Sequence, residues 1–90
     1  MTIDRFFDWV VEWAESKDFR GCPARAIAHD QRAWFAERLR EWTTAAGVKD
    51  SKATARALMV LFDGAIAGSE VDGPQRASDA RWMARKLLAD

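Results

Sequence analysis

Two polar residues lie within an apolar helical stripe in the middle of the chain, where they are well placed to bind a ligand. Gln31 and Arg38 are seven residues apart and have Trp34, Phe35 and Trp42 around them. Aromatic walls with a few placed polar groups are typical of small-molecule pockets. The pattern predicts a ligand site made of Gln31, Trp34, Arg38 and Trp42, in which Arg38 meets a carboxylate. Two alternatives stay open: Arg38 extends to water from the end of the core, or it makes a structural hydrogen bond to another helix.

Reactive side chains of other kinds are few. Cys22 is the only cysteine and His29 the only histidine, so an intrachain disulfide is impossible and a Cys/His metal site is close to excluded. His29 and Asp30 are sequence neighbours that point in different directions on a helix, so they form no catalytic pair. We expect a solvated His29 and a small, buried Cys22. The sequence has no Gly-rich phosphate loop, HExxH or CxxC motif, and it predicts neither an enzyme nor a bound cofactor or metal.

The charge balance and the apolar runs bear on which partners the chain is able to bind. Lys and Arg together number 14, as do Asp and Glu, so the net charge is zero. This argues against direct nucleic-acid binding by this chain, because such proteins are usually basic. No apolar run approaches the roughly 18 residues of a membrane span. The start MTIDRFF has no basic n-region and is not a signal peptide, so we expect a cytoplasmic protein.

Four helices must position these side chains, and no strand pattern is visible. Thr2 and Ser51 are the predicted N-caps, and Gly47 and Gly73 the predicted stops. The first four of the five tryptophans are expected in the core rather than at a cofactor. The fold class is therefore all-α, a single domain over residues 1–90. The helices are predicted over residues 3–16, 23–46 (a break near 29–30 stays open), 51–71 and 74–88.

The third predicted helix has two apolar faces. One holds large residues and is ordinary core: Leu58, Leu61, Phe62, Ala65 and Ile66. A narrow polar stripe holds Lys52, Arg56, Asp63 and Glu70, where Asp63 is expected to be exposed. The remaining face is small and apolar: Ala53, Ala57, Val60, Gly64, Ala67, Gly68 and Val71. Each glycine costs about 1 kcal/mol relative to alanine inside a helix, which indicates that another helix approaches closely there. A second copy of the chain or a helix of the same chain would satisfy this pattern.

A two-fold homodimer is the preferred interpretation, because it brings the same face of each subunit together. If the fourth helix joins the contact, the interface is a four-helix bundle. The fourth helix has an apolar face of Ala77, Ala80, Met83, Ala84, Leu87 and Leu88. Trp82 lies off that face and is expected to be an interface residue, a pocket lid or a partly covered surface ring. The predicted dimer interface is Ala57, Val60, Gly64, Ala67, Gly68, Val71, Ala80 and Ala84.

The order and spacing of the motifs resemble the C-terminal domain of TetR-family transcriptional regulators, over nearly the whole chain. The motifs are FRGCP at residues 19–23, HDQRAWF at residues 29–35, ALMVLFDGA at residues 57–65 and DGP at residues 72–74. The resemblance implies a dimer built by the last two helices and a pocket among the preceding ones that accepts a small-molecule effector. The family's helix-turn-helix precedes this region and is not part of these ninety residues. After Pro23 the chain joins the next helix almost at once, whereas related domains have a longer stretch that walls the pocket.

Two functions therefore remain. The first is a dimerisation and small-molecule-sensing domain of a TetR-like regulator. The second is a helical protein-interaction module without a ligand, which binds another protein through Trp82 and the small-residue face.

Overall fold

The chain is all-α, as the sequence predicts. In a computed structural model, residues 2–16 and 30–89 are described, and these residues contain no strand. The part of the predicted second helix that precedes residue 30, with Cys22 and His29, lies outside the described residues. The helices are α1 (Ile3–Glu15), α3 (Arg32–Ala45), α4 (Ser51–Asp72) and α5 (Gln75–Ala89).

The helix ends follow local capping chemistry. The Thr2 hydroxyl accepts a hydrogen bond from the Arg5 amide at 3.2 Å, which confirms the first predicted N-cap. Gly47 and Gly73 have φ of 73° and 95°, in the left-handed region that favours glycine after a helix. The predicted cap of α4 is wrong by one residue. Asp50 is the cap, with its carboxylate 3.2 Å from the Ala53 amide, and Ser51 is the first helical residue.

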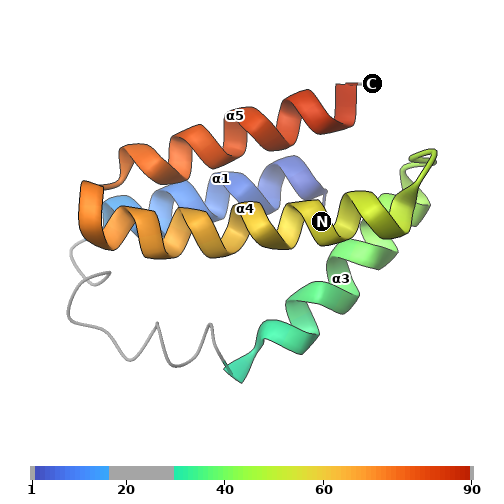
Figure 1. The fold of residues 1–90 in the computed structure, drawn as a ribbon, viewed down its shortest axis with the longest axis horizontal. Coiled ribbons are helices and arrows are strands. Elements are labelled where there is room, and N and C mark those ends of the chain that lie inside the picture. The colour runs from blue at the N-terminus through green and yellow to red at the C-terminus, as the bar shows by residue number, and fades with distance from the viewer. Residues whose placement is uncertain (1, 17–29, 90) are drawn as a thin grey trace.

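The helices pack in two layers. α4 and α5 lie antiparallel side by side, α1 lies behind them, and α3 packs across the first part of α4 (Figure 1). α1 therefore covers the inner sides of both α4 and α5, and the opposite sides of these two helices have no helix over them among the described elements.

Phe6 of α1 lies at the centre of the core, fully surrounded by other side chains. Its ring centroid is 5.5 Å from that of Phe35 in α3, 5.5 Å from that of Phe62 in α4 and 5.7 Å from that of Trp42 in α3. Tilted aromatic contacts of this kind add to the free energy of burial. One side chain therefore joins three helices.

A buried threonine that sequence reasoning overlooked fixes the turn between α3 and α4. Thr43 is fully buried, and its hydroxyl lies 2.9 Å from the Leu39 carbonyl and 3.2 Å from the Ser51 carbonyl. The backbone carbonyl of Thr43 also accepts from the Val48 amide at 3.2 Å. A buried hydroxyl is tolerated because it is hydrogen-bonded, and here its partners lie at the end of one helix and the start of the next.

Ion pairs hold the outer edge of α1 to α5. Arg85 donates from Nε to Asp4 Oδ1 at 2.6 Å and from Nη2 to Asp4 Oδ2 at 3.3 Å. One turn away, Arg81 donates to Asp8 Oδ1 at 2.9 Å. The hydrogen bond from Arg85 lowers the pKa of Asp4 below its usual value. The carboxylate form of Asp4 is thus the form that favours the packing of α1 on α5.

Replacing Asp4 by Asn is expected to lower the free energy of unfolding at pH 7 by a small amount, because the pair is exposed. Since the pKa of Asp4 is lower in the folded chain, its stabilisation is present above the unfolded pKa of about 3.9 and lost as pH falls through the folded pKa. The difference between wild type and Asp4→Asn in urea unfolding should therefore shrink below about pH 4. Glu12→Gln, another exposed carboxylate of α1, is the control. A difference that is the same at pH 7 and pH 3 would contradict a charge-based role.

Candidate functional site

The four residues predicted to bind a ligand lie along α3, from its N-cap to its last turn, and differ in their surroundings. Gln31 is exposed at the start of α3 and makes no capping bond with its side chain. Trp34 is 50% exposed. Trp42 packs against Phe6 and lines a hollow of about 440 Å³ at one end of the bundle. The other residues that line it are Thr2, Ile3, Asp4, Ala45, Ala46, Val48 and Leu88. Gln31, Trp34 and Arg38 do not line that hollow.

Arg38 behaves more like the first alternative, a side chain that extends from the edge of the core. Its guanidinium lies 5.6 Å from the centroid of the Trp34 ring, and its Nη2 donates to Glu41 Oε1 at 2.8 Å. Its Nε is buried and has no hydrogen-bond partner among the described residues. The charged end of Arg38 is therefore already engaged by Trp34 and Glu41.

The tryptophans divide between core and surface, so the expectation that four of them are core residues is only half right. Trp13 and Trp42 are half-buried, whereas Trp9 is 43% exposed, like Trp34 on the neighbouring helix. Trp9 stacks on Trp13 with ring centroids 5.5 Å apart and lies 6.3 Å from Phe35. An aromatic surface therefore extends from α1 to α3.

Asp63 is half-exposed on the polar stripe of α4, close to its predicted environment. It forms an ion pair with Arg32 in the first turn of α3. This pair connects the stripe to α3.

The small-residue face of α4 is largely open. Gly64 is exposed, and a Cβ built on it would meet nothing within 4 Å. Val60 is 69% exposed and Val71 is 81% exposed, with Ala67 exposed between them. Removing the surface of branched apolar side chains from water is energetically favourable. This part of the predicted dimer interface is therefore uncovered in the single chain.

Three residues of the predicted dimer interface are instead covered by the chain itself. Ala80 and Ala84 are buried in the core, so their methyl groups are not available to a second copy. Gly68 lies against α5, where a Cβ would come within 3.1 Å of Arg76 Cβ and Cγ. Its small size is explained by close packing of α5 on α4. The expectation for these three positions is corrected because periodicity identifies an apolar face but not the neighbour that covers it.

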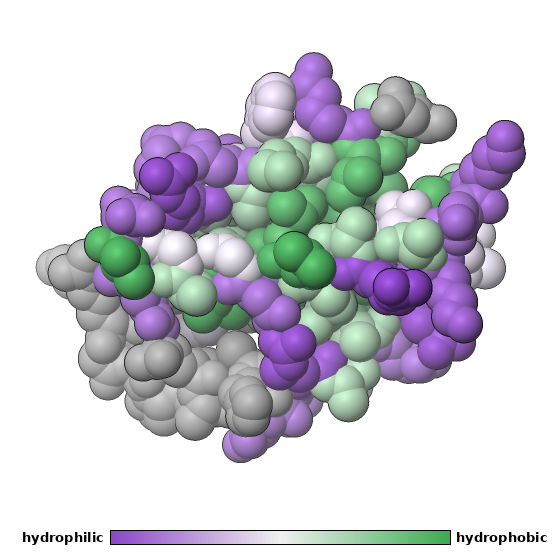
Figure 2. All heavy atoms as spheres, viewed as in Figure 1, coloured by the Kyte–Doolittle hydropathy of each residue, from purple (hydrophilic) through white to green (hydrophobic). Residues whose placement is uncertain are grey.

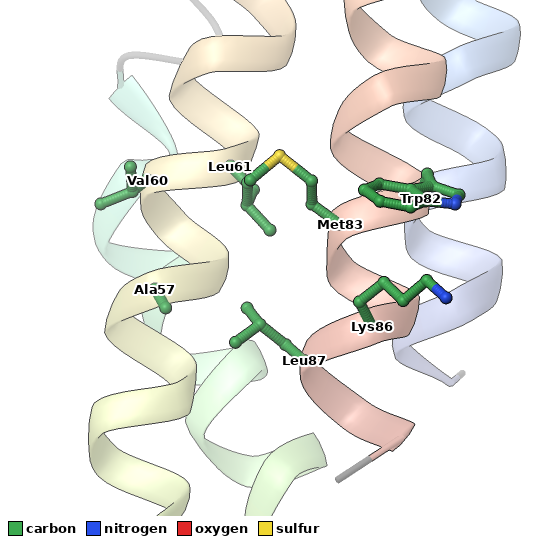
Figure 3. A pocket seen from close by; sticks show the side chains of 7 residues that line it. All are labelled: Ala57, Val60, Leu61, Trp82, Met83, Lys86 and Leu87. Carbon is green, nitrogen blue, oxygen red and sulfur yellow. The ribbon is translucent and has the colours of Figure 1, made fainter.

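A groove of about 520 Å³ separates the outer sides of α4 and α5. Leu61 and Met83 point toward one another between the helices, and Leu87 points toward Ala57 (Figure 3). Trp82 is 61% exposed at the other side of α5, with the Lys86 ammonium 5.3 Å from its ring centroid. The predicted exposure of Trp82 is thus confirmed.

The exposed residues of α5 that border this groove belong to the predicted apolar face of that helix. Met83 is 49% exposed and Leu87 is 41% exposed. The alanines on the same helix, Ala77, Ala80 and Ala84, make the actual contact with the bundle. The signal that separates the two sets is side-chain size, since the alanines allow α5 to approach α1 and α4 closely and leave the larger residues outside.

Together these residues form one continuous surface, which we call the outer face. Figure 2 shows apolar surface over α4 and α5 with hydrophilic side chains around it. The outer face comprises Ala57, Val60, Leu61, Gly64, Ala67 and Val71 of α4 and Trp82, Met83 and Leu87 of α5.

The described residues contain no group of three or more His, Cys, Asp or Glu side chains that would hold a metal ion. None of the helices in the described part of the chain is both long and apolar enough to cross a membrane.

Replacing Arg38 by Ala is expected to lower the free energy of unfolding by about 1 kcal/mol, because it removes one cation–π contact and one partly exposed ion pair. Arg40→Ala, which removes only a 3.7 Å contact with Glu37 on the same helix, should change it by a few tenths. Thermal or urea unfolding of both variants measures this. A loss above about 3 kcal/mol for Arg38→Ala would indicate a desolvated charge with a buried partner instead.

Comparisons with protein-family models, with curated proteins and with solved structures find no match to this chain.

Proposed function

We propose that this chain is the dimerisation domain of a cytoplasmic, TetR-like transcriptional regulator, with no enzymatic role, and that two copies join through the outer face. Two observations support the proposal. The order of sequence motifs resembles that family, in which the last two helices build the dimer. Independently, the last two helices of this chain carry apolar residues on the side that the bundle leaves uncovered. The exposed outer face is the observation on which the proposal depends.

The composition of this face favours burial. Soluble monomers seldom expose a contiguous apolar patch of more than a few hundred square ångströms. Here Val60, Val71, Trp82, Met83 and Leu87 are all between 41% and 81% exposed within two adjacent helices. Covering a large apolar side chain contributes about 1.5–3 kcal/mol, so a partner that covered several of them would offset much of the entropic cost of association.

The size of the face also suits a stable dimer. A 22-residue helix such as α4 is about 33 Å long, and two adjacent helices are about 20 Å wide. Because α5 has only 15 residues and is about 22 Å long, the footprint is on the order of 550 Å² before side-chain relief is counted. Each partner contributes roughly 800 Å² to a standard interface.

The sensing role is assigned to the surface where α1 and α3 meet. Trp9 and Trp34 present exposed aromatic edges there beside half-buried Phe35, and the guanidinium of Arg38 lies over Trp34. A flat apolar effector fits the aromatic edges, and an acidic group on it would compete with Glu41 for the guanidinium of Arg38. In this proposal the effector contacts α3, which is tied to α4 through the Arg32–Asp63 pair.

The alternative function, a helical module that binds a different protein, is favoured by one feature. The groove beside Trp82 and Met83 would accept the apolar ridge of a foreign helix. A wild-type chain that stays monomeric at all concentrations would favour this alternative over self-association.

Gly64→Leu separates folding from self-association, because the two effects have opposite signs. The side chain has open space in the single chain, and leucine has a helix propensity about 0.8–1 kcal/mol better than glycine. The unfolding midpoint of the diluted monomer should therefore rise or stay the same. Self-association should weaken at least tenfold in sedimentation velocity, since the leucine keeps the second copy at a distance.

Lys52→Leu is the matched control, because it adds the same side chain to α4 on the polar stripe. It should leave the dimer dissociation constant within about twofold of wild type. A Gly64→Leu variant that dimerises as tightly as wild type would show that the small-residue face is not the contact.

A further inference from the structure

Along both borders of the outer face, the basic residues lie toward one end and the acidic residues toward the other. On the border of α4, exposed Arg56 is near the start of the helix and half-buried Glu70 is near its end. On the border of α5, half-buried Asp79 comes first and exposed Lys86 comes later. Because α4 and α5 are antiparallel (Figure 1), both basic residues lie at one end of the face and both acidic residues at the other.

The charges near the start of α4 are also net basic. Lys49 and Lys52 lie at that end, on either side of the N-cap carboxylate of Asp50. At the acidic end, the carboxylates of Asp72 and Asp79 share the single guanidinium of Arg76, with distances of 3.3 and 2.9 Å. The acidic end therefore keeps an excess of negative charge, and the outer face is electrostatically polar along its length.

The reversal of charge falls at nearly the same level on both helices. Gly68 lies against Arg76, and Leu61 and Met83 line the same part of the groove. Residues 63–64 of α4 are thus level with about residue 80 of α5. On α4, the midpoint between Arg56 and Glu70 is Asp63. On α5, the midpoint between Asp79 and Lys86 falls between residues 82 and 83. Both midpoints lie within about one helical turn of Gly64.

This pattern distinguishes between the two ways in which a second copy can cover the face with two-fold symmetry. If α4 packed on α5 of the second copy, the basic ends of both subunits would meet and repel. If α4 packed antiparallel on α4 of the second copy, each basic end would meet an acidic end. Like charges in contact suppress an arrangement, and opposite charges favour it.

We infer that two copies pack with α4 antiparallel on α4 and α5 antiparallel on α5, and that the two-fold axis passes beside Gly64. This inference rests on the proposed function, since it requires a dimer through the outer face. Lys86 then faces Asp79 of the second copy, and Arg56 lies toward the acidic end of the second copy. At Gly64, where an added Cβ would meet nothing within 4 Å among the described residues, the two α4 backbones approach at the axis.

A disulfide at the axis tests the arrangement. In the full chain with Cys22→Ser, Gly64→Cys places a thiol beside its own symmetry mate and should form a covalent dimer on mild oxidation. Val71→Cys, on the same face, is the matched control. Its two copies lie seven residues beyond the axis in opposite directions, about 21 Å apart, well beyond the 7 Å between Cα atoms that a disulfide allows. Non-reducing electrophoresis should show the covalent dimer for Gly64→Cys alone.

Each other outcome overturns a stated part of the inference. Cross-linking at both positions would mean that the two α4 helices are parallel. Cross-linking at neither position in a chain that sediments as a dimer would mean that α4 does not pack on α4. A chain that sediments as a monomer would remove the proposed function itself.

A charge exchange on α5 gives a second readout that needs no new cysteine. Lys86→Asp should weaken the dimer about tenfold, because two mutually repelling contacts replace two attractive ones. Adding Asp79→Lys to the same chain should restore an affinity within about threefold of wild type. The competing arrangement predicts the opposite first result, a tighter dimer, since residue 86 would then face Arg56 of the second copy.

Discussion

The structure depends on one geometric constraint: α4 has two apolar faces, and α1 is able to cover only one of them. Phe6 of α1 inserts between α3 and α4, with Phe35 and Phe62 both 5.5 Å from its ring centroid. Ion pairs from Asp4 and Asp8 to Arg85 and Arg81 then hold α1 against α5. With α1 fixed behind the α4–α5 layer, the front of that layer has no cover among the described elements, and the outer face follows directly from this arrangement.

The two glycines within α4 have different surroundings: one packs against α5 and the other faces open space. Gly68 allows Arg76 of α5 to pass at 3.1 Å from the position of a Cβ, so it belongs to the fold of the single chain. Gly64 faces open space, and no close neighbour among the described residues explains the loss of helix propensity that it brings. A contact with a second copy supplies a reason for Gly64, and the charge pattern along the borders supplies an orientation for that contact.

Sequence reasoning located the four helices because their apolar periodicity and their caps are local properties. Thr2, Gly47 and Gly73 terminate helices as expected, whereas Asp50 and Ser51 are adjacent good caps and sequence alone did not separate them. The site was harder to predict. Ala80 and Met83 share an apolar face of α5, yet only the alanine enters the core. Burial of a side chain depends on which helix packs over it and how closely, and periodicity does not contain that information. Among the predicted ligand residues, Trp42 packs against Phe6 while Trp34 remains at the surface, a difference that apolar periodicity does not predict.

The molar mass of the wild-type chain in solution tests the central claim most directly. Light scattering coupled to size-exclusion chromatography, run from sub-micromolar to hundreds of micromolar, should show a mass that rises with concentration to twice the chain mass of 10.2 kDa and no further, because a two-fold contact closes on itself. A mass that stays at that of one chain throughout, or one that grows beyond two chains, would contradict a closed dimer through the outer face.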